Sequence, residues 1–270
     1  MNPLPRVRFL VNSFADGGTE RQAVLLANAL HQSGRWLVRV DSLEPGGPLA
    51  NVLDDALRLA RKSYPLEGFM TIGACRALAA FATSLRSDRV DVLHTHGFYP
   101  NVFGMAAGAL AGVPVRIASK RESVALRSGA RRRIERVAFA LATRVVANCN
   151  AVRDELVGEG IGSHRIVVIP NAVDPRRIPA AEPDACGVGD AARARVPGTN
   201  GGGPRLVAVT NFHHAAKDHA TLLRALRRVV GACPDAHLTI AGDGPRIREV
   251  TALVQSLGLG AHVHLAGRCE

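Results

Sequence analysis

Three groups of residues in this 270-residue sequence stand just before predicted helices, where an anion could bind. Gly17-Gly18 lies between an apolar run and a helical pattern, so backbone N–H groups and the positive end of a helix dipole would face a ligand there. Gly242-Asp243-Gly244-Pro245 repeats this arrangement, and Lys217 stands one residue before another predicted helix. These features fit a phosphate, whereas a tight turn without a ligand or a solvated lysine is the alternative. A complete G-x-G-x-x-G dinucleotide motif is absent from the sequence.

Two histidine pairs follow predicted strands, where ligands of α/β proteins gather. His94 and His96 flank the end of one strand, and His213 and His214 follow a later one. The H-x-H spacing could supply two zinc ligands, but the sequence offers no identifiable third ligand, so we expect no metal. Neither G-x-S-x-G nor H-E-x-x-H occurs, and the sequence indicates no nucleophile.

Short β-branched runs alternate with helical patterns, which is typical of a parallel α/β sheet. The sequence predicts strands over residues 7–11, 37–41, 90–95, 115–119, 144–147, 166–169, 206–210, 237–241 and 263–266. Helices are predicted after Gly17-Gly18 and over 131–142, 151–158 and 218–230. Thr19 with Gln22 has the spacing of a capping box, and Pro245 should open the first turn of a further helix.

A change in composition divides the chain. Residues 178–204 are rich in proline and glycine and predict a linker or surface loop. We therefore expect a first domain over 1–177 and a second over 205–270. The second domain holds only part of the roughly five or six strands usual for a doubly wound sheet, so we expect it to be incomplete.

The net charge of +11 comes almost entirely from arginines spread along the chain. No basic patch with interleaved aromatic residues occurs, so we expect no nucleic-acid partner, whereas an anionic substrate fits. Residues 127–136 carry five arginines and predict a basic amphipathic helix. A solvated face is one interpretation of this helix, and docking on an anionic membrane is the other.

The spacing of the cysteines and the length of the apolar runs bear on where in the cell the protein is expected. The sequence holds five cysteines without a C-x-x-C pair, which favours thiols in a reducing environment. No run of about 18 apolar residues is present. We expect a soluble, cytoplasmic protein, with the inner face of the membrane as an additional location if the basic helix docks there.

The order of the motifs resembles the large retaining glycosyltransferase family, known as family 4 or group 1, that includes sucrose synthases and many bacterial polysaccharide enzymes. The resemblance covers nearly the whole chain outside the glycine-rich segment. It is carried by Val7 through Gly17-Gly18-Thr19-Glu20-Arg21, Asp91–Gly97, Gly112-Val113-Pro114, Ala147–Val152, Ile169–Asp174, Lys217-Asp218, Gly242–Pro245 and Val263–Gly267.

This resemblance implies a GT-B fold of two Rossmann-like, doubly wound domains. It further implies transfer of a hexosyl unit from a nucleotide-diphosphate sugar to a cell-surface glycan or lipid-linked acceptor, with retention and without a metal or other cofactor. By the same resemblance, Lys217 and His96 are catalytic, and His94 and Glu20 lie on the acceptor side. The residues implied for the donor and its phosphates are Gly17, Gly18, Asn211, Lys217, Gly242, Gly244, Gly267 and Arg268.

The chain departs from the family pattern at several positions. Asn211 or Phe212 stands near the place of a phosphate-binding arginine, and Lys120-Arg121-Glu122 stands where the family often has a histidine. The family's paired glutamates are not found, so we expect a C-terminally truncated chain that binds donor weakly or not at all and has little or no activity. A sugar-nucleotide epimerase of the same fold and a non-catalytic remnant are the alternatives.

Overall fold

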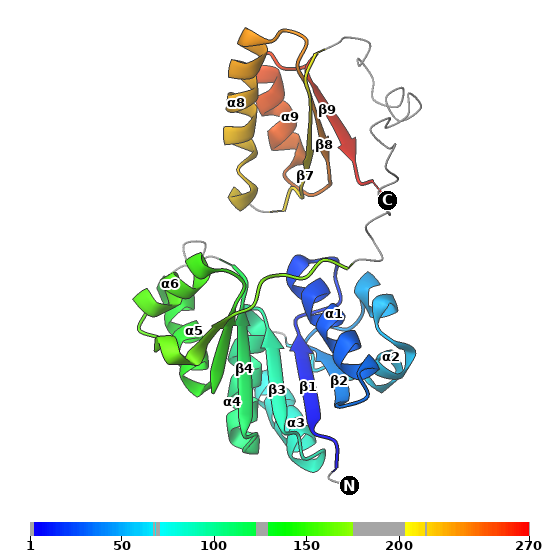
Figure 1. Ribbon diagram of the computed structural model, residues 1–270, viewed down its shortest axis with the longest axis vertical. Coiled ribbons are helices and arrows are strands. Elements are labelled where there is room, and N and C mark those ends of the chain that lie inside the picture. The colour runs from blue at the N-terminus through cyan, green and yellow to red at the C-terminus, as the bar shows by residue number, and fades with distance from the viewer. Residues whose placement is uncertain are drawn as a thin grey trace. The chain divides into compact units, whose positions relative to one another are not determined.

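A computed structural model of the protein describes residues 3–66, 68, 71–122, 129–174, 203–213 and 215–269. Contacts divide the chain into two compact units, Met1–Ile178 and Pro179–Glu270. Each unit is built on its own parallel sheet (Figure 1). Most of the predicted linker, residues 178–202, lies outside the described residues.

The first unit holds a six-stranded parallel sheet in the order β2-β1-β3-β4-β5-β6. Its strands are β1 Arg6–Val11, β2 Leu37–Ser42, β3 Val92–His96, β4 Val115–Lys120, β5 Arg144–Ala147 and β6 Ile166–Val168. All six were predicted, with ends shifted by a residue or two. β3 begins later than expected because the N–H of Val90 bonds the Leu85 carbonyl at the end of the preceding helix.

Helices cover both faces of this sheet (Figure 1). The helix α1, Gly18–Gln32, packs on one face with η1, Pro48–Val52, and α2, Asp55–Ala60. The other face is covered by α3 Ile72–Ser87, α4 Phe98–Ala111, α5 Gly129–Leu141 and α6 Asn150–Gly158. Buried parallel strands with helices on both sides explain why the core is built from aliphatic residues.

The start of α1 differs from the prediction. Gly17 is the N-cap, and as a glycine it has no side chain that could cap the helix. Thr19 therefore lies inside the first turn, where it cannot cap the helix, and the predicted capping box with Gln22 is wrong. The other end agrees with the sequence, because Gly34 follows the C-cap in a left-handed conformation with φ of 64°.

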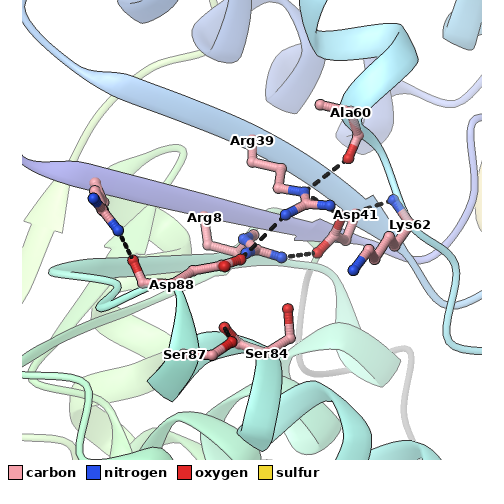
Figure 2. Close-up of polar contacts among 9 residues, drawn as sticks. Arg8, Arg39, Asp41, Ala60, Lys62, Ser84, Ser87 and Asp88 are labelled. Atoms are coloured by element: carbon pink, nitrogen blue, oxygen red, sulfur yellow. Dashed lines mark hydrogen bonds and ion pairs between the residues drawn. The ribbon is translucent and has the colours of Figure 1, made fainter.

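A buried ion network joins β1, β2 and the end of α3 (Figure 2). Arg8 on β1 is only 2% exposed and donates hydrogen bonds to the carboxylates of Asp41 on β2 and Asp88 at the C-cap of α3. Arg39 adds a bond of 3.1 Å to Asp88, and the backbone N–H of Lys62 donates to Asp41 at 2.8 Å. The charged groups satisfy one another, so the network is structural and needs no ligand.

The second unit holds a three-stranded parallel sheet in the order β7-β8-β9. The strands are β7 Arg205–Val209, β8 His237–Ala241 and β9 Val263–Gly267, joined by the helices α8 His219–Ala232 and α9 Ile247–Ser256. Pro245 was expected in the first turn of α9 but lies before it in a turn, because the N–H of the next residue, Arg246, bonds the Phe212 carbonyl at 3.1 Å.

Candidate functional site

The strand order of the first sheet reverses between β1 and β3. Ligands of open parallel sheets bind at the carboxyl ends of the strands beside such a switch point. Gly17 and Gly18 follow β1, and His96 is the last residue of β3. The two loops approach each other, since a Cβ built on Gly97 would lie 3.9 Å from the methyl group of Thr19. The structure therefore brings two separately predicted groups to one edge of the sheet.

The N-terminus of α1 faces a carboxylate of its own. A Cβ built on Gly17 would lie 2.2 Å from Oε2 of Glu20, whereas one built on Gly18 meets nothing within 4 Å. Burial raises the pKa of Glu20, the bond from its own N–H opposes this, and the negative charges of Glu122 and Glu44 raise it further. A phosphate at this helix end would have to displace the Glu20 carboxylate.

His94 and His96 belong to an enclosed cluster of rings. Their ring centroids lie 4.2 Å apart, and the Phe9 ring lies 5.4 Å from His94 and 5.7 Å from His96. Nε2 of His94 lies 2.8 Å from Oγ of Ser119. His96 is 0% exposed, and neither of its ring nitrogens has a hydrogen-bond partner among the described residues.

Both imidazoles are neutral at physiological pH. Burial, with a smaller contribution from the charge of Arg121, lowers the pKa of His94 to about 3. Burial also holds the pKa of His96 well below its ordinary value, helped by His94 and Arg121. His96 can therefore donate one hydrogen bond and accept another, but it cannot act as a cation.

These two histidines should make the protein less stable in acid. Their folded-state pKa values lie below the unfolded value of about 6.5, so the unfolded chain binds more protons at any pH between the two. The contribution of the two histidines to the free energy of unfolding is complete above the unfolded pKa of about 6.5 and is lost as the pH falls from there toward the folded-state pKa values. We expect the free energy of unfolding to fall by about 1 kcal/mol for each histidine between about pH 6.5 and 5.5. Urea titrations measure this, and His96→Phe should lose its share; an undiminished pH dependence in that variant would contradict the assignment.

Two basic residues at the end of β4, Lys120 and Arg121, have side chains in different environments. Lys120 is 1% exposed and forms an ion pair with the buried Glu135 of α5. Arg121 is half-buried and donates to Oδ1 of Asn171, in the segment that follows β6. No ion pair links Arg121 to a carboxylate within the described ranges, and burial lowers its pKa. The sequence marked Lys120-Arg121-Glu122 as unusual but did not indicate a role for Arg121.

The segment after β6 also contacts α1. The side-chain amide of Gln22 donates to the Ala172 carbonyl and accepts from the Ala172 N–H, both at 2.7 Å. Together with α1 and η1, this segment lines a groove of about 600 Å³. The motif Ile169–Asp174 thus contributes Asn171 and Ala172 to the carboxyl edge of the first sheet, a role that its local sequence does not reveal.

In the second unit, Lys217 ends an exposed 3₁₀ turn, Ala215–Lys217. It makes no hydrogen bond or ion pair with any residue that the structure describes. The next residue, Asp218, has φ of 44° and caps α8 by accepting the N–H of Thr221 at 3.2 Å. Hydrogen bonds from Thr221 lower the pKa of Asp218. The cap fixes the backbone beside Lys217 and leaves its ammonium available to an anion.

The loop after β7 holds Asn211 and Phe212, the two residues that stand near the place of the family's phosphate-binding arginine, and the structure gives them different environments. Phe212 is 0% exposed, and its ring stacks on that of His219 at 4.6 Å, so it belongs to the core. Asn211 is exposed, and its Oδ1 accepts the N–H of His213 at 3.3 Å. Only Asn211 can therefore face a ligand at this position. His214 lies outside the described residues.

Gly242 and Gly244 have a packing role that the sequence did not predict. A Cβ built on Gly242 would lie 1.7 Å from the Thr210 carbonyl oxygen, and one built on Gly244 would lie 2.6 Å from the Phe212 carbonyl carbon. Their φ values are 147° and 152°. The absence of side chains lets the loop after β8 pack directly on the loop after β7. The proposed phosphate contacts of these glycines would come in addition to this role.

Gly242→Ala should destabilise the second unit. The new methyl group meets backbone, and φ of 147° is unfavourable for alanine. We expect the free energy of unfolding to fall by about 1–3 kcal/mol. Gly260→Ala is the matched control, because a Cβ there meets nothing within 4 Å. Urea unfolding followed by circular dichroism measures both, and equal effects would show that the close approach does not matter.

The last predicted donor residues lie at the end of β9. Gly267 has φ of 69°, and its carbonyl accepts the N–H of Gly242 at 2.7 Å, which joins the ends of β8 and β9. Arg268 follows as an exposed residue. Across the described ranges, the structure holds no group of three or more His, Cys, Asp or Glu side chains that could bind a metal.

The predicted basic helix is α5, and residues 127–128 of the prediction lie outside the described chain. Arg133 and Arg136 make no hydrogen bond or ion pair with described residues. They line two shallow hollows of about 470 and 340 Å³. Val137 beside them is 64% exposed, so an apolar side chain stands among the arginines on the outer face. Within the described chain, no helix is long and apolar enough to span a membrane.

Two family models match the sequence. Residues 16–177 match Glycosyltransferase Family 4, and residues 203–270 match Glycosyl transferases group 1. One curated relative is UDP-Gal:alpha-D-GlcNAc-diphosphoundecaprenol alpha-1,3-galactosyltransferase from Escherichia coli, 28% identical over 138 residues. The match spans 47% of this chain and 35% of that relative, about a third of the relative's length.

Solved structures share the fold. Anabaena Alr3699/HepE in complex with UDP and glucose has a TM-score of 0.78 at 18% identity, over 98% of this chain and 70% of that one. The lipopolysaccharide outer core galactosyltransferase WaaB has a TM-score of 0.64 at 15% identity, over 98% of this chain and 68% of that one. A UDP-N-acetylglucosamine 2-epimerase has a TM-score of 0.57 at 15% identity, over 99% of this chain and 70% of that one. The α/β fold of GT-B type, with two sheets, is thereby confirmed.

Proposed function

This chain belongs to glycosyltransferase family 4, and from that membership we propose that the protein transfers a hexosyl unit from a nucleotide-diphosphate sugar to a lipid-linked or cell-surface glycan acceptor. We propose further that the transfer retains the configuration at the anomeric carbon. The observation that carries the proposal is the family match over residues 16–177, more than half of the chain. The match covers only 35% of the length of the E. coli relative. For this reason the reaction, which is the activity of a whole protein, is stated for this chain as a proposal.

The donor that we propose is a UDP-hexose. The E. coli relative is named for UDP-Gal, and the Anabaena structure is a complex with UDP and glucose. Departure of UDP builds negative charge on the diphosphate. Hydrogen-bond donors and positive charges that the protein holds in place can stabilise this charge. Lys217 is exposed and unpaired among the described residues, which suits this role. We assign the donor side to Lys217 with Gly17, Gly18, Asn211, Gly242, Gly244, Gly267 and Arg268.

The acceptor that we propose is a sugar diphosphate carried on a lipid. The name of the E. coli relative specifies alpha-D-GlcNAc-diphosphoundecaprenol as its acceptor. On this chain, the acceptor side is assigned to His94, His96 and Glu20, which lie at the carboxyl edge of the first sheet. Since His96 is neutral, we propose that it orients a hydroxyl group by hydrogen bonding. No metal or other cofactor takes part in the proposed reaction, and unchanged turnover in EDTA is the expected result.

A lipid-linked acceptor requires contact with a membrane, and we propose that α5 makes this contact. Each arginine near an anionic bilayer contributes about 1 kcal/mol. Arg133→Glu/Arg136→Glu should therefore weaken binding to phosphatidylglycerol vesicles by roughly ten- to thirtyfold or more. Arg227→Glu/Arg228→Glu on α8 is the charge-matched control for vesicle co-sedimentation. Equal loss in both variants would point to net charge instead of α5.

Transfer is tested by incubating the protein with UDP-galactose or UDP-glucose and a short-chain lipid diphosphate of N-acetylglucosamine. The expected product is the acceptor with the added mass of one hexose, detected by mass spectrometry. An epimerase of the same fold, which the structural likeness to a UDP-N-acetylglucosamine 2-epimerase keeps as an alternative, would change the nucleotide sugar without acceptor. Isomerised nucleotide sugar in the absence of any elongated acceptor would contradict the proposed function.

A further inference from the structure

Polar atoms without partners cluster at one edge of the first sheet. Six buried side-chain nitrogen or oxygen atoms have no hydrogen-bond partner among the described residues. Four of the six are both ring nitrogens of His96, Nε of Arg121 and Oδ1 of Asn148. Buried polar atoms are nearly always paired in folded proteins, so such a cluster marks a place where something else completes the bonding.

The three residues come from neighbouring strands. His96 is the last residue of β3, Arg121 directly follows β4, and Asn148 directly follows β5. These strands are adjacent in the sheet, next to the switch point between β1 and β3. Arg121 and Asn148 are half-buried as residues, so parts of both side chains are open to a ligand, whereas their unpartnered atoms and the whole of His96 are buried.

The charge of Arg121 is not balanced by its surroundings. The side-chain partner of its guanidinium is the neutral amide oxygen of Asn171. The side-chain amide of Asn148 donates to the Arg121 carbonyl at 3.4 Å, and the imidazole of His96 is neutral. A partly desolvated guanidinium among neutral groups is costly, and an anion that binds beside it removes that cost.

The unpartnered atoms define the chemistry of a ligand. Nε of Arg121 can only donate a hydrogen bond, Oδ1 of Asn148 can only accept one, and neutral His96 offers one donor and one acceptor. A matching ligand must therefore carry anionic oxygen atoms and hydroxyl donors side by side. Inorganic phosphate in its dianionic form carries a single hydroxyl group, on the phosphorus itself, and has no separate hydroxyl donors, and an uncharged sugar lacks the anion. A sugar phosphate carries both.

We propose that Arg121 and Asn148 form a subsite for a sugar phosphate, in which the guanidinium binds phosphate oxygens and the amide oxygen accepts a sugar hydroxyl. His96 lies at the same edge of the sheet but is fully enclosed, so it is not assigned a contact with the ligand. The inference rests on the proposed function, because it identifies the glycosyl phosphate part of the acceptor as the group held by the first unit. The same chemistry occurs in the donor, so the two sources have to be separated by experiment.

Calorimetric titration with N-acetylglucosamine 1-phosphate, N-acetylglucosamine and UDP separates them. The wild-type protein should bind the sugar phosphate more tightly than the free sugar. Arg121→Gln should weaken binding of the sugar phosphate by about ten- to a hundredfold, because a charge-assisted contact is lost, and should leave UDP binding unchanged. If the variant instead loses only UDP, the anion belongs to the donor and the proposal is wrong. If the wild type binds neither sugar, ordered water completes the cluster, and the proposal is equally wrong.

Matched variants guard against effects of folding and net charge. Arg153→Gln removes one partly exposed arginine from α6, which pairs with Asp154, and should bind as the wild type does. Asn148→Ala should weaken both N-acetylglucosamine 1-phosphate and the free sugar. If Arg121→Gln does not fold, Arg121→Lys keeps the charge without the planar fork and should still lose affinity for the sugar phosphate. Wild-type affinity in Arg121→Lys together with wild-type affinity in Asn148→Ala would overturn the subsite.

Steady-state kinetics distinguishes failure of this inference from failure of the proposed function. Arg121→Gln should raise the KM for the acceptor and leave the KM for the nucleotide sugar unchanged. An active wild-type enzyme whose acceptor KM does not respond would refute the subsite and leave the transferase intact. Conversely, a protein that binds sugar phosphate through Arg121 but elongates no acceptor would keep the subsite and refute the transferase.

Discussion

Arg8→Met is expected to lower the free energy of unfolding by about 3–5 kcal/mol, the usual effect of removing one partner from a buried ion pair. Arg8 is 2% exposed and Asp41 is 0% exposed. Without the guanidinium, the Asp41 carboxylate stays buried. Among the described residues it then keeps only the backbone N–H of Lys62 as a donor, apart from the distant Arg39 at 3.8 Å. Urea unfolding monitored by circular dichroism gives the difference directly.

Two further variants define what this loss means. Arg39→Met removes another partner of Asp88, and the Arg39 side chain is 25% exposed. This variant should lower the free energy of unfolding much less, because solvent can replace the contact. Arg8→Met/Asp41→Leu removes both members of the buried pair and should recover part of the stability, since no charge is left buried. A double variant less stable than Arg8→Met would show that the pair is not the reason for the loss.

Lys217→Ala is expected to reduce the rate of sugar transfer by roughly 10²-fold or more, as for other losses of charge stabilisation in a transition state. Lys217 is exposed and carries the positive charge directly before the cap of α8. Its contribution should appear in kcat, because negative charge on the diphosphate grows as the bond to the sugar breaks. Initial rates measured at saturating donor test this.

The control for Lys217→Ala is Lys62→Ala. Lys62 is also exposed, and its contact with the ion network is made by its backbone N–H, which alanine keeps. Lys62→Ala should therefore transfer sugar at the wild-type rate. An unchanged rate in Lys217→Ala would remove this residue from the mechanism, whereas equal losses in both variants would indicate an effect of net charge.

The strands could be predicted closely because a parallel strand buried on both faces must be a short, nearly continuous apolar run. Phe9, Leu93 and Val145 are all 0% exposed within such runs. Helix ends were predicted less well, since a cap depends on where the preceding chain arrives. Thr19 has the right neighbour for a capping box, but the N-cap of α1 is Gly17, so the helix begins earlier in the chain than that box requires.

The candidate site was predictable only where local sequence implies a position. His96 and Gly17 could be placed because His96 lies at the end of a recognisable strand and Gly17 lies in the loop after another, and parallel strands bring their carboxyl ends together. Arg121 and Asn171 are fifty positions apart, and their contact depends on the path of the chain after β6. The close packing at Gly242 depends on a carbonyl in another loop. Such long-range contacts leave no periodic or spacing signal in a single sequence.

The measurement that most directly tests sugar transfer with retention is the anomeric configuration of the elongated acceptor. Nuclear magnetic resonance of the product formed from an α-linked UDP-hexose reports it without further chemistry. We predict an α-linked hexose on the lipid diphosphate acceptor. A β-linked product would contradict retention, and an unmodified acceptor beside isomerised nucleotide sugar would contradict transfer itself.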